Sequence, residues 1–461
     1  MSFTSLNFIL LFLPAFLAVY LLVPARWREA AAFAGSLVFY ALGAPLSCAA
    51  LLLGVTLFTF CMARVISRSV GDGRRMLTIF AVFVVLCVLL YFKYTDFFLE
   101  SLSSLLRTEL ALPQLLLPLG LSFYSFQAVG YLVDVYRGME AERSFAAFGA
   151  FLTAFPQLTM GPTLRYHDVR GALRSHRVTR SALELGFGRF IAGLSCKVLL
   201  ADRLAALWQA LERTGFESIS TPLAWLGAVG YSLQLYFDFA GYSLMAMGLG
   251  QMIGLPVPRN FDLPYLSRSV GEFYRRWHIT LGSWFRDYLY IPLGGSRCGT
   301  ARTVCNLLVV WALTGLWHGA SWNFVLWGLA LFVLIAAEKL FLGGLLARSR
   351  VLGHLYVLFF IPVTWMLFRI TDLSQLGVYL ARMFPFFGVG ETLFSGDFLH
   401  RLSEFYQPLL AGAVLCLPWP RRFFERYQSR WWMSAALLVL FFLCVRAISL
   451  SSGDAFLYAN F

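Results

Sequence analysis

The sequence predicts an all-α polytopic membrane protein, and three observations carry this prediction. Of its 461 residues, 59% are hydrophobic and only 13% are charged, whereas a soluble protein carries roughly 25% charged residues. Mean hydropathy is accordingly high, at +0.71. Apolar runs long enough to cross a bilayer recur along the chain. Basic loops alternate with loops poor in positive charge, a pattern typical of a chain that crosses a membrane repeatedly.

The apolar runs predict roughly 11–12 spans, of which several are short and loosely bounded. In chain order they lie near residues 6–23, 30–43, 46–63, 77–95, 113–135, 183–207, 222–253, 304–320, 321–338, 353–372, 405–419 and 432–450. We expect the first run to be a retained span, because it has neither a basic leader nor a small-residue cleavage site. We find no internal repeat and no linker, so we expect a single integral-membrane domain over residues 1–461.

The distribution of arginine predicts the orientation of the chain. The formal net charge is +13, and the chain has only three lysines. The basic loops are 26–28, 64–75, 137–143, 165–180, 259–302, 339–350 and 421–430. The loops poor in positive charge are 44–47, 95–109, 212–221 and 391–404. The positive-inside rule places the first set in the cytoplasm and the second outside. Because orientation explains the basic residues, we expect the lipid bilayer, and no nucleic acid, as a partner.

Two segments depart from simple spans. Residues 145–163 are apolar but lie between two basic loops and contain Pro156 and Pro162, which predicts a re-entrant or in-plane segment enclosed by protein. On a helical wheel, most polar side chains of residues 275–289 share an arc of about 140°, and apolar side chains fill the opposite side. This pattern predicts one interfacial helix with His278 facing the protein interior.

A single histidine, His318, lies within the long apolar stretch 304–329. A charged side chain at a helix centre costs roughly 2.5–3.5 kcal/mol on insertion scales. Imidazole avoids much of this cost by staying neutral, and a neutral imidazole is the usual general base near physiological pH. Its neighbours one helical turn away are mostly small: Thr314, Gly315, Ser321 and Trp322. We therefore expect a proton-handling site here, with a packing histidine as the alternative.

A second histidine, His278, lies in the least hydrophobic long region, residues 231–297. It is either a site residue or a helix-packing histidine that is hydrogen-bonded to backbone. The arginines on the polar face of residues 275–289 have two interpretations. They either snorkel at the membrane surface or bind the phosphates of an anionic acyl carrier, for which forked guanidinium donors are well suited.

The remaining polar residues of the apolar runs carry weaker signals. Gln234 and Asp238 share a helix face and can satisfy each other or a neighbouring helix. Glu338 borders a basic loop and needs no special role. The eight cysteines include no CxxC pair, and we expect neither disulfides nor a metal site. The chain has no P-loop, dinucleotide fingerprint or GxSxG elbow, so a covalent acyl-serine is not expected.

Five segments together resemble the membrane-bound O-acyltransferase (MBOAT) family, and most closely its bacterial alginate O-acetyltransferase branch. They are RRWHITLGSWFRDYLYIPLGG (275–295), LTGLWHGASWNFVLWG (313–328), LQLYFDFAGYS (233–243), FPQLTMGPTLRY (155–166) and FLYANF (456–461). The two histidine segments and their spacing are specific together, and each alone is weak. The chain departs from the family pattern at Leu244, where relatives often carry aspartate, and at Gln251, where arginine is common. These departures bear on the acceptor or partner and not on the histidine chemistry.

The resemblance implies an MBOAT-like helical fold around a central tunnel, with His318 as the active-site histidine and His278 as its second motif histidine. It also implies an enzyme of the bacterial inner membrane that takes an acyl group, most often acetyl, from a cytoplasmic thioester. Relatives pass this group to a periplasmic partner that modifies a polysaccharide or peptidoglycan, and we expect O-acylation of a polysaccharide here, directly or through an SGNH-type partner. A neighbouring branch of the family transfers D-alanine from a carrier protein to teichoic acid, which is the alternative activity.

On this basis we expect His318 to accept the proton of a hydroxyl that attacks the thioester. We expect His278 either to donate to the oxyanion or to orient the acceptor. The expected donor-binding residues are Arg275, Arg276, Arg286, Asp287 and Tyr288. The expected tunnel-lining residues are Asp238, Tyr242, Trp317, Ser321 and Asn323. We expect acetyl-CoA or another acyl thioester as co-substrate and no tightly bound cofactor or metal. One alternative of another class is a proton-coupled solute transporter, which the lack of repeats and the amphipathic helix beside the histidines disfavour. Another is a scaffold that only anchors a periplasmic acyltransferase.

Overall fold

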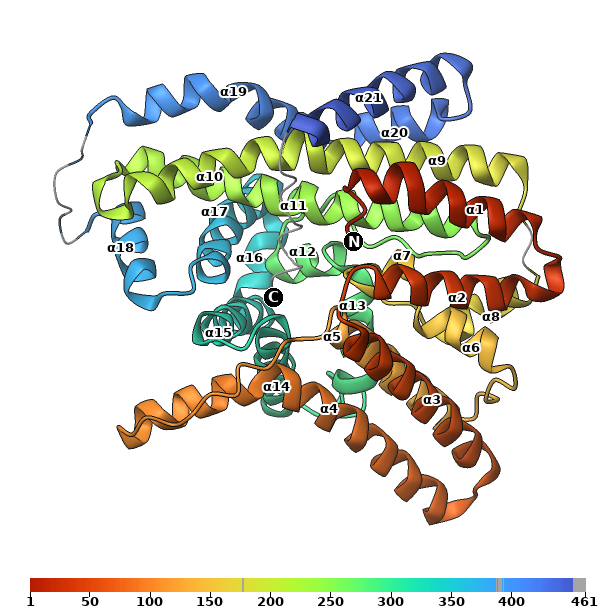
Figure 1. Cartoon of the computed structure of the whole chain (residues 1–461). Coiled ribbons are helices and arrows are strands. Elements are labelled where there is room, and N and C mark those ends of the chain that lie inside the picture. The colour runs from red at the N-terminus through yellow and green to blue at the C-terminus, as the bar shows by residue number, and fades with distance from the viewer. Residues whose placement is uncertain (176–177, 387, 389–391, 393, 451–461) are drawn as a thin grey trace. The chain divides into compact units, whose positions relative to one another are not determined.

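A computed structural model describes residues 1–175, 178–386, 388, 392 and 394–450 (Figure 1). The described residues are mostly helical and form no β-strand, and they contain one isolated β-bridge. They pack into two compact units, one formed by residues 1–191, 243–259 and 448–450 and the other by residues 192–242 and 260–447. The predicted motif segment 456–461 lies outside the described residues.

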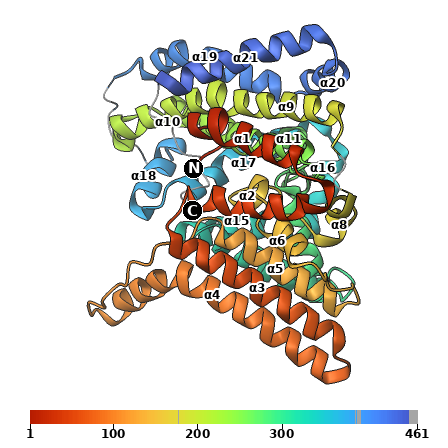
Figure 2. The same ribbon diagram turned by 45° about the vertical axis from the view of Figure 1, so that its right-hand side comes forward.

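The helices of the first unit come from the N-terminal part of the chain. They are η1 (Asn7–Phe12), α1 (Leu13–Leu22), η2 (Ala25–Trp27), α2 (Arg28–Ala41), α3 (Leu46–Arg68), α4 (Gly71–Leu106), α5 (Leu121–Tyr136), α6 (Phe145–Leu152), α7 (Phe155–Leu158), α8 (Tyr166–Ser175) and most of α9 (Arg180–Ser195). Helices α3, α4 and α5 pack against one another, as Figure 2 shows. The phenyl ring of Phe155 packs among the rings of Phe8, Phe16 and Phe39 and forms part of this unit's core.

The segment predicted to be re-entrant or in-plane, residues 145–163, forms the two short helices α6 and α7. The Ser144 hydroxyl accepts a hydrogen bond from Ala147 N at 3.1 Å and caps α6. At the end of α6 the chain leaves the helix, and Gln157 Nε2 donates to the Phe151 carbonyl at 2.8 Å. Nearly all side chains here are buried, so protein surrounds this broken backbone, as such a segment requires.

The second unit carries the remaining helices. They are η3 (Cys196–Ala201), α10 (Asp202–Thr214), η4 (Phe216–Ser218), much of α11 (Thr221–Met252), η5 (Pro264–Leu266), α12 (Val270–Arg276), α13 (Ile279–Phe285), η6 (Arg286–Tyr290), α14 (Thr300–His318), α15 (Trp322–Ala337), η7 (Glu338–Leu342), α16 (Gly343–Arg348), α17 (Arg350–Arg369), α18 (Leu373–Met383), α19 (Asp397–Leu415), α20 (Pro418–Tyr427) and α21 (Trp431–Leu450). Helices α14 and α15 form a close antiparallel pair, and α15 also packs on α17.

By length and composition, six helical segments of the described chain can cross a membrane. They are α3, α4, α14, the continuous run Trp322–Arg348, α17 and α21. The other predicted spans are also largely helical, although they are shorter or less apolar. The protein is therefore an all-α polytopic membrane protein, as the sequence predicts. How many of the remaining helices cross the bilayer stays a prediction.

Candidate active site

The prediction of one helix over residues 275–289 is wrong, because the helix is interrupted at His278. Helix α12 ends at Arg276, His278 has a left-handed φ of 48°, and α13 starts at the next residue. The backbone groups near the break bond to another segment: Asp262 N donates to the Arg276 carbonyl, and Ile279 N donates to the Asn260 carbonyl, both at 2.9 Å. This short antiparallel bridge competes with helical hydrogen bonding and ends α12.

The His278 ring is buried, as the sequence predicts, with 4% of the residue exposed. Its Nδ1 lies 3.1 Å from Asn260 Oδ1. The ring makes an edge contact with Phe239, with centroids 4.7 Å apart, and lies 6.2 Å from the Trp317 ring. Burial disfavours the imidazolium ion and lowers the pKa of His278 to about 3. His278 is therefore neutral at physiological pH.

His318 is the last residue of α14 and is 5% exposed. The rings of Trp317, Trp327 and Phe368 surround it at centroid distances of 4.9, 4.9 and 5.4 Å. The backbone turns out of the helix at the next residue and enters α15 at Trp322. His318 thus lies at the carbonyl end of a helix, where the helix dipole stabilises a positive charge.

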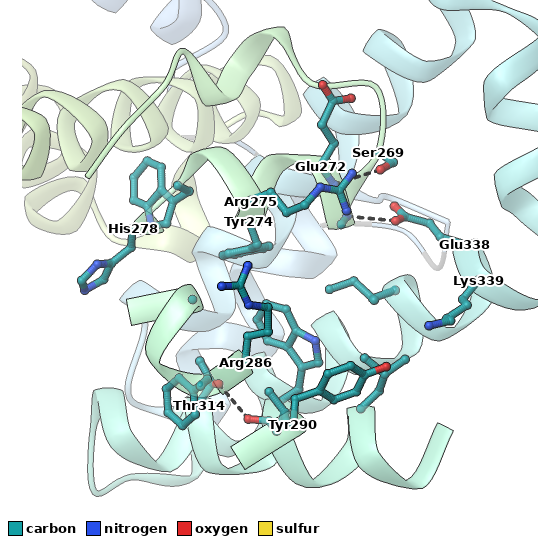
Figure 3. Close-up of a pocket in the computed structure, with 18 of the residues that line it drawn as sticks. Ser269, Glu272, Tyr274, Arg275, His278, Arg286, Tyr290, Thr314, Glu338 and Lys339 are labelled. Atoms are coloured by element: carbon teal, nitrogen blue, oxygen red, sulfur yellow. Dashed lines mark hydrogen bonds between the residues drawn. The ribbon is translucent and has the colours of Figure 1, made fainter. Parts of the chain in front are cut away.

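Both histidines line one cavity of about 870 Å³ in the second unit. Figure 3 shows part of its lining, including His278. Its wall comes from α12, α13, η6, α14, α15, η7 and α16. The aromatic lining includes Tyr274, Trp311 and Trp327. A largely apolar cavity with a few convergent polar groups is the usual form of a small-molecule site.

The same cavity is lined by four cationic side chains and two carboxylates. The cations are Arg268, Arg275, Arg286 and Lys339, and the carboxylates are Glu272 and Glu338. Burial opposes ionisation of Glu272, but the Arg268 backbone N–H and the Arg276 guanidinium outweigh it and hold the pKa of Glu272 below its usual value. The excess of cations suits an anionic ligand.

The predicted donor-binding residues separate into two groups. Arg275 and Arg286 line the cavity. Arg276, Asp287 and Tyr288 are not among the lining residues, and their part in donor binding stays a prediction. Arg276 pairs with a Glu272 oxygen at 2.7 Å, and Asp287 pairs with Arg286 at 2.6 Å. The break at His278 places Arg276 in α12 and Asp287 and Tyr288 in η6, so these residues do not share one helix face.

The predicted tunnel-lining residues Asp238, Tyr242, Trp317, Ser321 and Asn323 are not among the residues that line this cavity. Asp238 forms an ion pair with Lys197, with Oδ1 and Nζ 2.7 Å apart, and both side chains are at most 3% exposed. Asn323 Nδ2 donates to two carbonyls of α17 and fixes α15 to that helix. Trp317 contacts both histidine rings.

Sequence reasoning missed Glu338 and Lys339, which line the cavity next to α12 (Figure 3). The Glu338 carboxylate accepts hydrogen bonds from the backbone N–H groups of Val270 and Gly271, the latter at 2.9 Å. The interpretation of Glu338 as a loop-border residue without a role is therefore wrong. Its partners lie 67 and 68 positions earlier, and no local pattern signals such a contact.

The helical fold and this cavity define a class: a multi-pass membrane protein whose buried imidazoles face one pocket. Comparison with known proteins identifies the family within this class. Residues 141–345 match the sequence profile of the MBOAT, membrane-bound O-acyltransferase family. A probable alginate O-acetylase of Azotobacter vinelandii is 40% identical over 84% of this chain and 78% of its own length.

Two further relatives agree with this match. A probable alginate O-acetylase of Pseudomonas aeruginosa is 41% identical over 84% of this chain and 75% of its own length. A peptidoglycan O-acetyltransferase of Helicobacter pylori is 29% identical over 100% of this chain and 97% of its own length. The chain belongs to the membrane-bound O-acyltransferase family and is an O-acyltransferase.

Proposed function

We propose that this enzyme takes an acetyl group from a cytoplasmic thioester and transfers it through the bacterial inner membrane for O-acetylation of an extracytoplasmic polysaccharide. The observation that carries the proposal is the pair of buried histidines on one cavity that also holds an excess of cationic side chains. The relatives named as alginate O-acetylases and as a peptidoglycan O-acetyltransferase support acetyl as the group and a glycan as the acceptor. We propose that transfer is direct or passes through an SGNH-type periplasmic partner.

His318 acts as the general base in this proposal. The acceptor hydroxyl oxygen forms a bond to the thioester carbonyl carbon while His318 takes the hydroxyl proton. The tetrahedral intermediate then collapses, the carbon–sulfur bond breaks, and the proton passes to the thiolate. Because His318 ends α14, the carbonyl end of that helix stabilises the transient imidazolium.

The cationic side chains hold the donor. Arg275 and Arg286 provide forked donors for phosphates, and Lys339 and Arg268 add positive charge to the same wall. Acetyl-CoA or another acyl thioester carries such phosphates and is a co-substrate, so no tightly bound cofactor is required. His278 orients the reactants from another part of the wall.

Inverted membrane vesicles test the proposal, because their cytoplasmic face is outside. Radiolabelled acetyl-CoA is added to vesicles of the wild type, of His318→Ala and of His400→Ala, and label on polysaccharide is measured at equal protein abundance. His400 is an exposed histidine of α19 and provides the matched control. We expect about 10²-fold or greater loss in His318→Ala and wild-type transfer in His400→Ala. Transfer by His318→Ala at the control rate contradicts the mechanism.

A further inference from the structure

The side chain of Asn260 determines which nitrogen of His278 carries the proton. Asn260 Oδ1 lies 3.2 Å from Thr280 N, 2.9 Å from Thr280 Oγ1 and 3.1 Å from His278 Nδ1. A backbone N–H can only donate, so the Asn260 atom facing it must be the amide oxygen. An amide oxygen can only accept. His278 Nδ1 must therefore carry the hydrogen of this contact.

The other ring nitrogen follows from this assignment. A neutral imidazole has one N–H, so a hydrogen on Nδ1 makes Nε2 a hydrogen-bond acceptor. His278 Nε2 is buried and has no hydrogen-bond partner within the described part of the chain. A buried polar atom without a partner is rare in folded proteins and calls for a ligand or a functional explanation. His278 lines the cavity, so the candidate for this ligand is a hydrogen-bond donor bound there.

We propose that Asn260 is a positioning residue that holds His278 in the Nδ1–H tautomer, so that Nε2 accepts a hydrogen bond from the hydroxyl of the incoming acceptor. This inference rests on the proposed function and makes it more specific. Of the two roles expected for His278, orienting the acceptor agrees with this tautomer. Donation to the oxyanion requires a proton on Nε2 and does not agree with it.

The backbone around His278 supports the same role for Asn260. The left-handed φ of His278 is sterically unfavourable for a residue other than glycine and persists only where surrounding contacts fix it. Asn260 supplies two such contacts to the residues that follow His278, since its carbonyl accepts from Ile279 N and its side chain accepts from Thr280 N. A bulkier or apolar residue at 260 removes the side-chain contacts and leaves the carbonyl contact in place.

The electrostatic surroundings of His278 allow a test by pH. The side chains packed on the ring from α11 and α14, Phe239 and Trp317, do not ionise. The neighbouring elements carry Asp238 of α11, which pairs with Lys197, and His318 of α14. They also carry Glu272, Arg275 and Arg276 of α12, Arg286 and Asp287 of η6, and Asp262, which pairs with Arg421. Burial alone lowers the pKa of His278 to about 3. In the wild type, His278 therefore stays neutral between pH 5.5 and 8.5 and adds no pH dependence.

Two substitutions at Asn260 separate positioning from simple packing. Asn260→Asp keeps an acceptor for Nδ1–H but places a carboxylate beside the ring, which stabilises the imidazolium and raises the pKa of His278. Imidazolium has no acceptor nitrogen, so transfer by this variant falls as the pH decreases through the raised pKa. Asn260→Leu has similar size and no acceptor, so either tautomer forms. Thr280→Val removes one donor to Asn260 and is the control.

Acetyl transfer by the full-length variants is measured in membranes from pH 5.5 to 8.5. We expect Thr280→Val to stay within about threefold of the wild type, and Asn260→Leu to lose about tenfold at every pH. We expect Asn260→Asp to approach the wild-type rate at pH 8.5 and to lose activity towards pH 5.5. Equal losses in both Asn260 variants with parallel pH profiles, or wild-type transfer by Asn260→Leu, overturn the proposal.

A second measurement does not depend on catalysis. Solid-state NMR of protein labelled with ¹⁵N-histidine, with His278→Gln to assign the signal, reports which ring nitrogen carries hydrogen. We expect Nδ1–H in the wild type and a mixture in Asn260→Leu; Nε2–H in the wild type overturns the inference. Failure of the proposed function is distinguishable, because it appears as transfer by His318→Ala whatever the His278 tautomer.

Discussion

Single residues of this site depend on contacts between distant parts of the sequence. The left-handed backbone of His278 costs of order 1–3 kcal/mol. The carbonyl and side chain of Asn260 offset this cost, since each satisfies a backbone N–H at the start of α13. The strained backbone of His278 is therefore held in place by Asn260, which lies 18 positions earlier in the sequence.

Glu338 gives a prediction at the same scale. Glu338→Ala leaves the partly buried N–H groups of Val270 and Gly271 without their acceptor, at a cost of up to about 1–3 kcal/mol for each group. Because α12 carries Arg275, we expect a higher KM for the acyl donor with a smaller change in kcat, and a lower unfolding temperature. Steady-state kinetics with varied acetyl-CoA and thermal unfolding in detergent measure both effects.

The control for this prediction is Glu404→Ala, which removes an exposed carboxylate of α19 whose ion pair with Arg401 lies at the surface. Such pairs contribute about 0–1 kcal/mol, so KM and unfolding temperature should match the wild type. If the Glu338 and Glu404 variants behave alike, Glu338 does not hold α12 in place.

The two histidines could be predicted from the sequence, whereas the groups that position them could not. His318 is conspicuous as an ionisable group in an apolar stretch, and the cavity beside it agrees with its small neighbours Thr314 and Gly315. Asn260 and Glu338 act through tertiary contacts. Since a side chain's partner in space leaves no periodic signal along the chain, local patterns could not reveal either residue.

At the scale of elements, hydrophobic periodicity predicts the helices well but misses the break between α12 and α13. Helices α14 and α15 lie near the predicted spans 304–320 and 321–338, because their apolar runs are long and uninterrupted. The stretch 275–289 also has helical periodicity, yet its helix ends where the backbone bridges Phe261. Periodicity records which side chains are apolar, and it does not record competition for backbone hydrogen bonds.

The α14–α15 pair gives a prediction about helix packing. A Cβ atom at Gly315 would lie 2.4 Å from the Phe324 carbonyl oxygen, so Gly315→Ala forces the two helices apart. Overpacking costs typically 1–3 kcal/mol, which exceeds the gain of about 1 kcal/mol in helix propensity. Because α14 ends at His318, we expect both a lower unfolding temperature and slower acetyl transfer.

Gly344→Ala is the matched control for the helix pair. Gly344 is exposed on α16, and a Cβ atom there meets no atom within 4 Å. This substitution should leave acetyl transfer unchanged and raise the unfolding temperature slightly or not at all. The unfolding temperature is read from the fraction of detergent-solubilised protein that stays monodisperse after heating. Equal unfolding temperatures for the two variants would show that α14 and α15 tolerate a wider separation.

For the whole molecule, the placement of charge predicts which side of the membrane receives the acyl donor. The loop that connects η6 to α14 contains Arg297, Arg302 follows in the first turn of α14, and both belong to the basic set. Residues 95–109 belong to the set poor in positive charge. The positive-inside rule therefore places the η6–α14 loop, next to the cationic part of the cavity lining, in the cytoplasm.

Cysteine labelling tests this orientation, because Cys298 is exposed in the η6–α14 loop. We expect a membrane-impermeant maleimide to label Cys298 in inverted vesicles and not in intact spheroplasts. Cys298→Ser measures the residual reaction of the other cysteines. In that background, Ser104→Cys places a thiol at an exposed position of α4 and should show the opposite pattern. Labelling of Cys298 in intact spheroplasts would reverse the orientation, and a cytoplasmic thioester would then lie on the wrong side of the membrane from the arginines proposed to bind it.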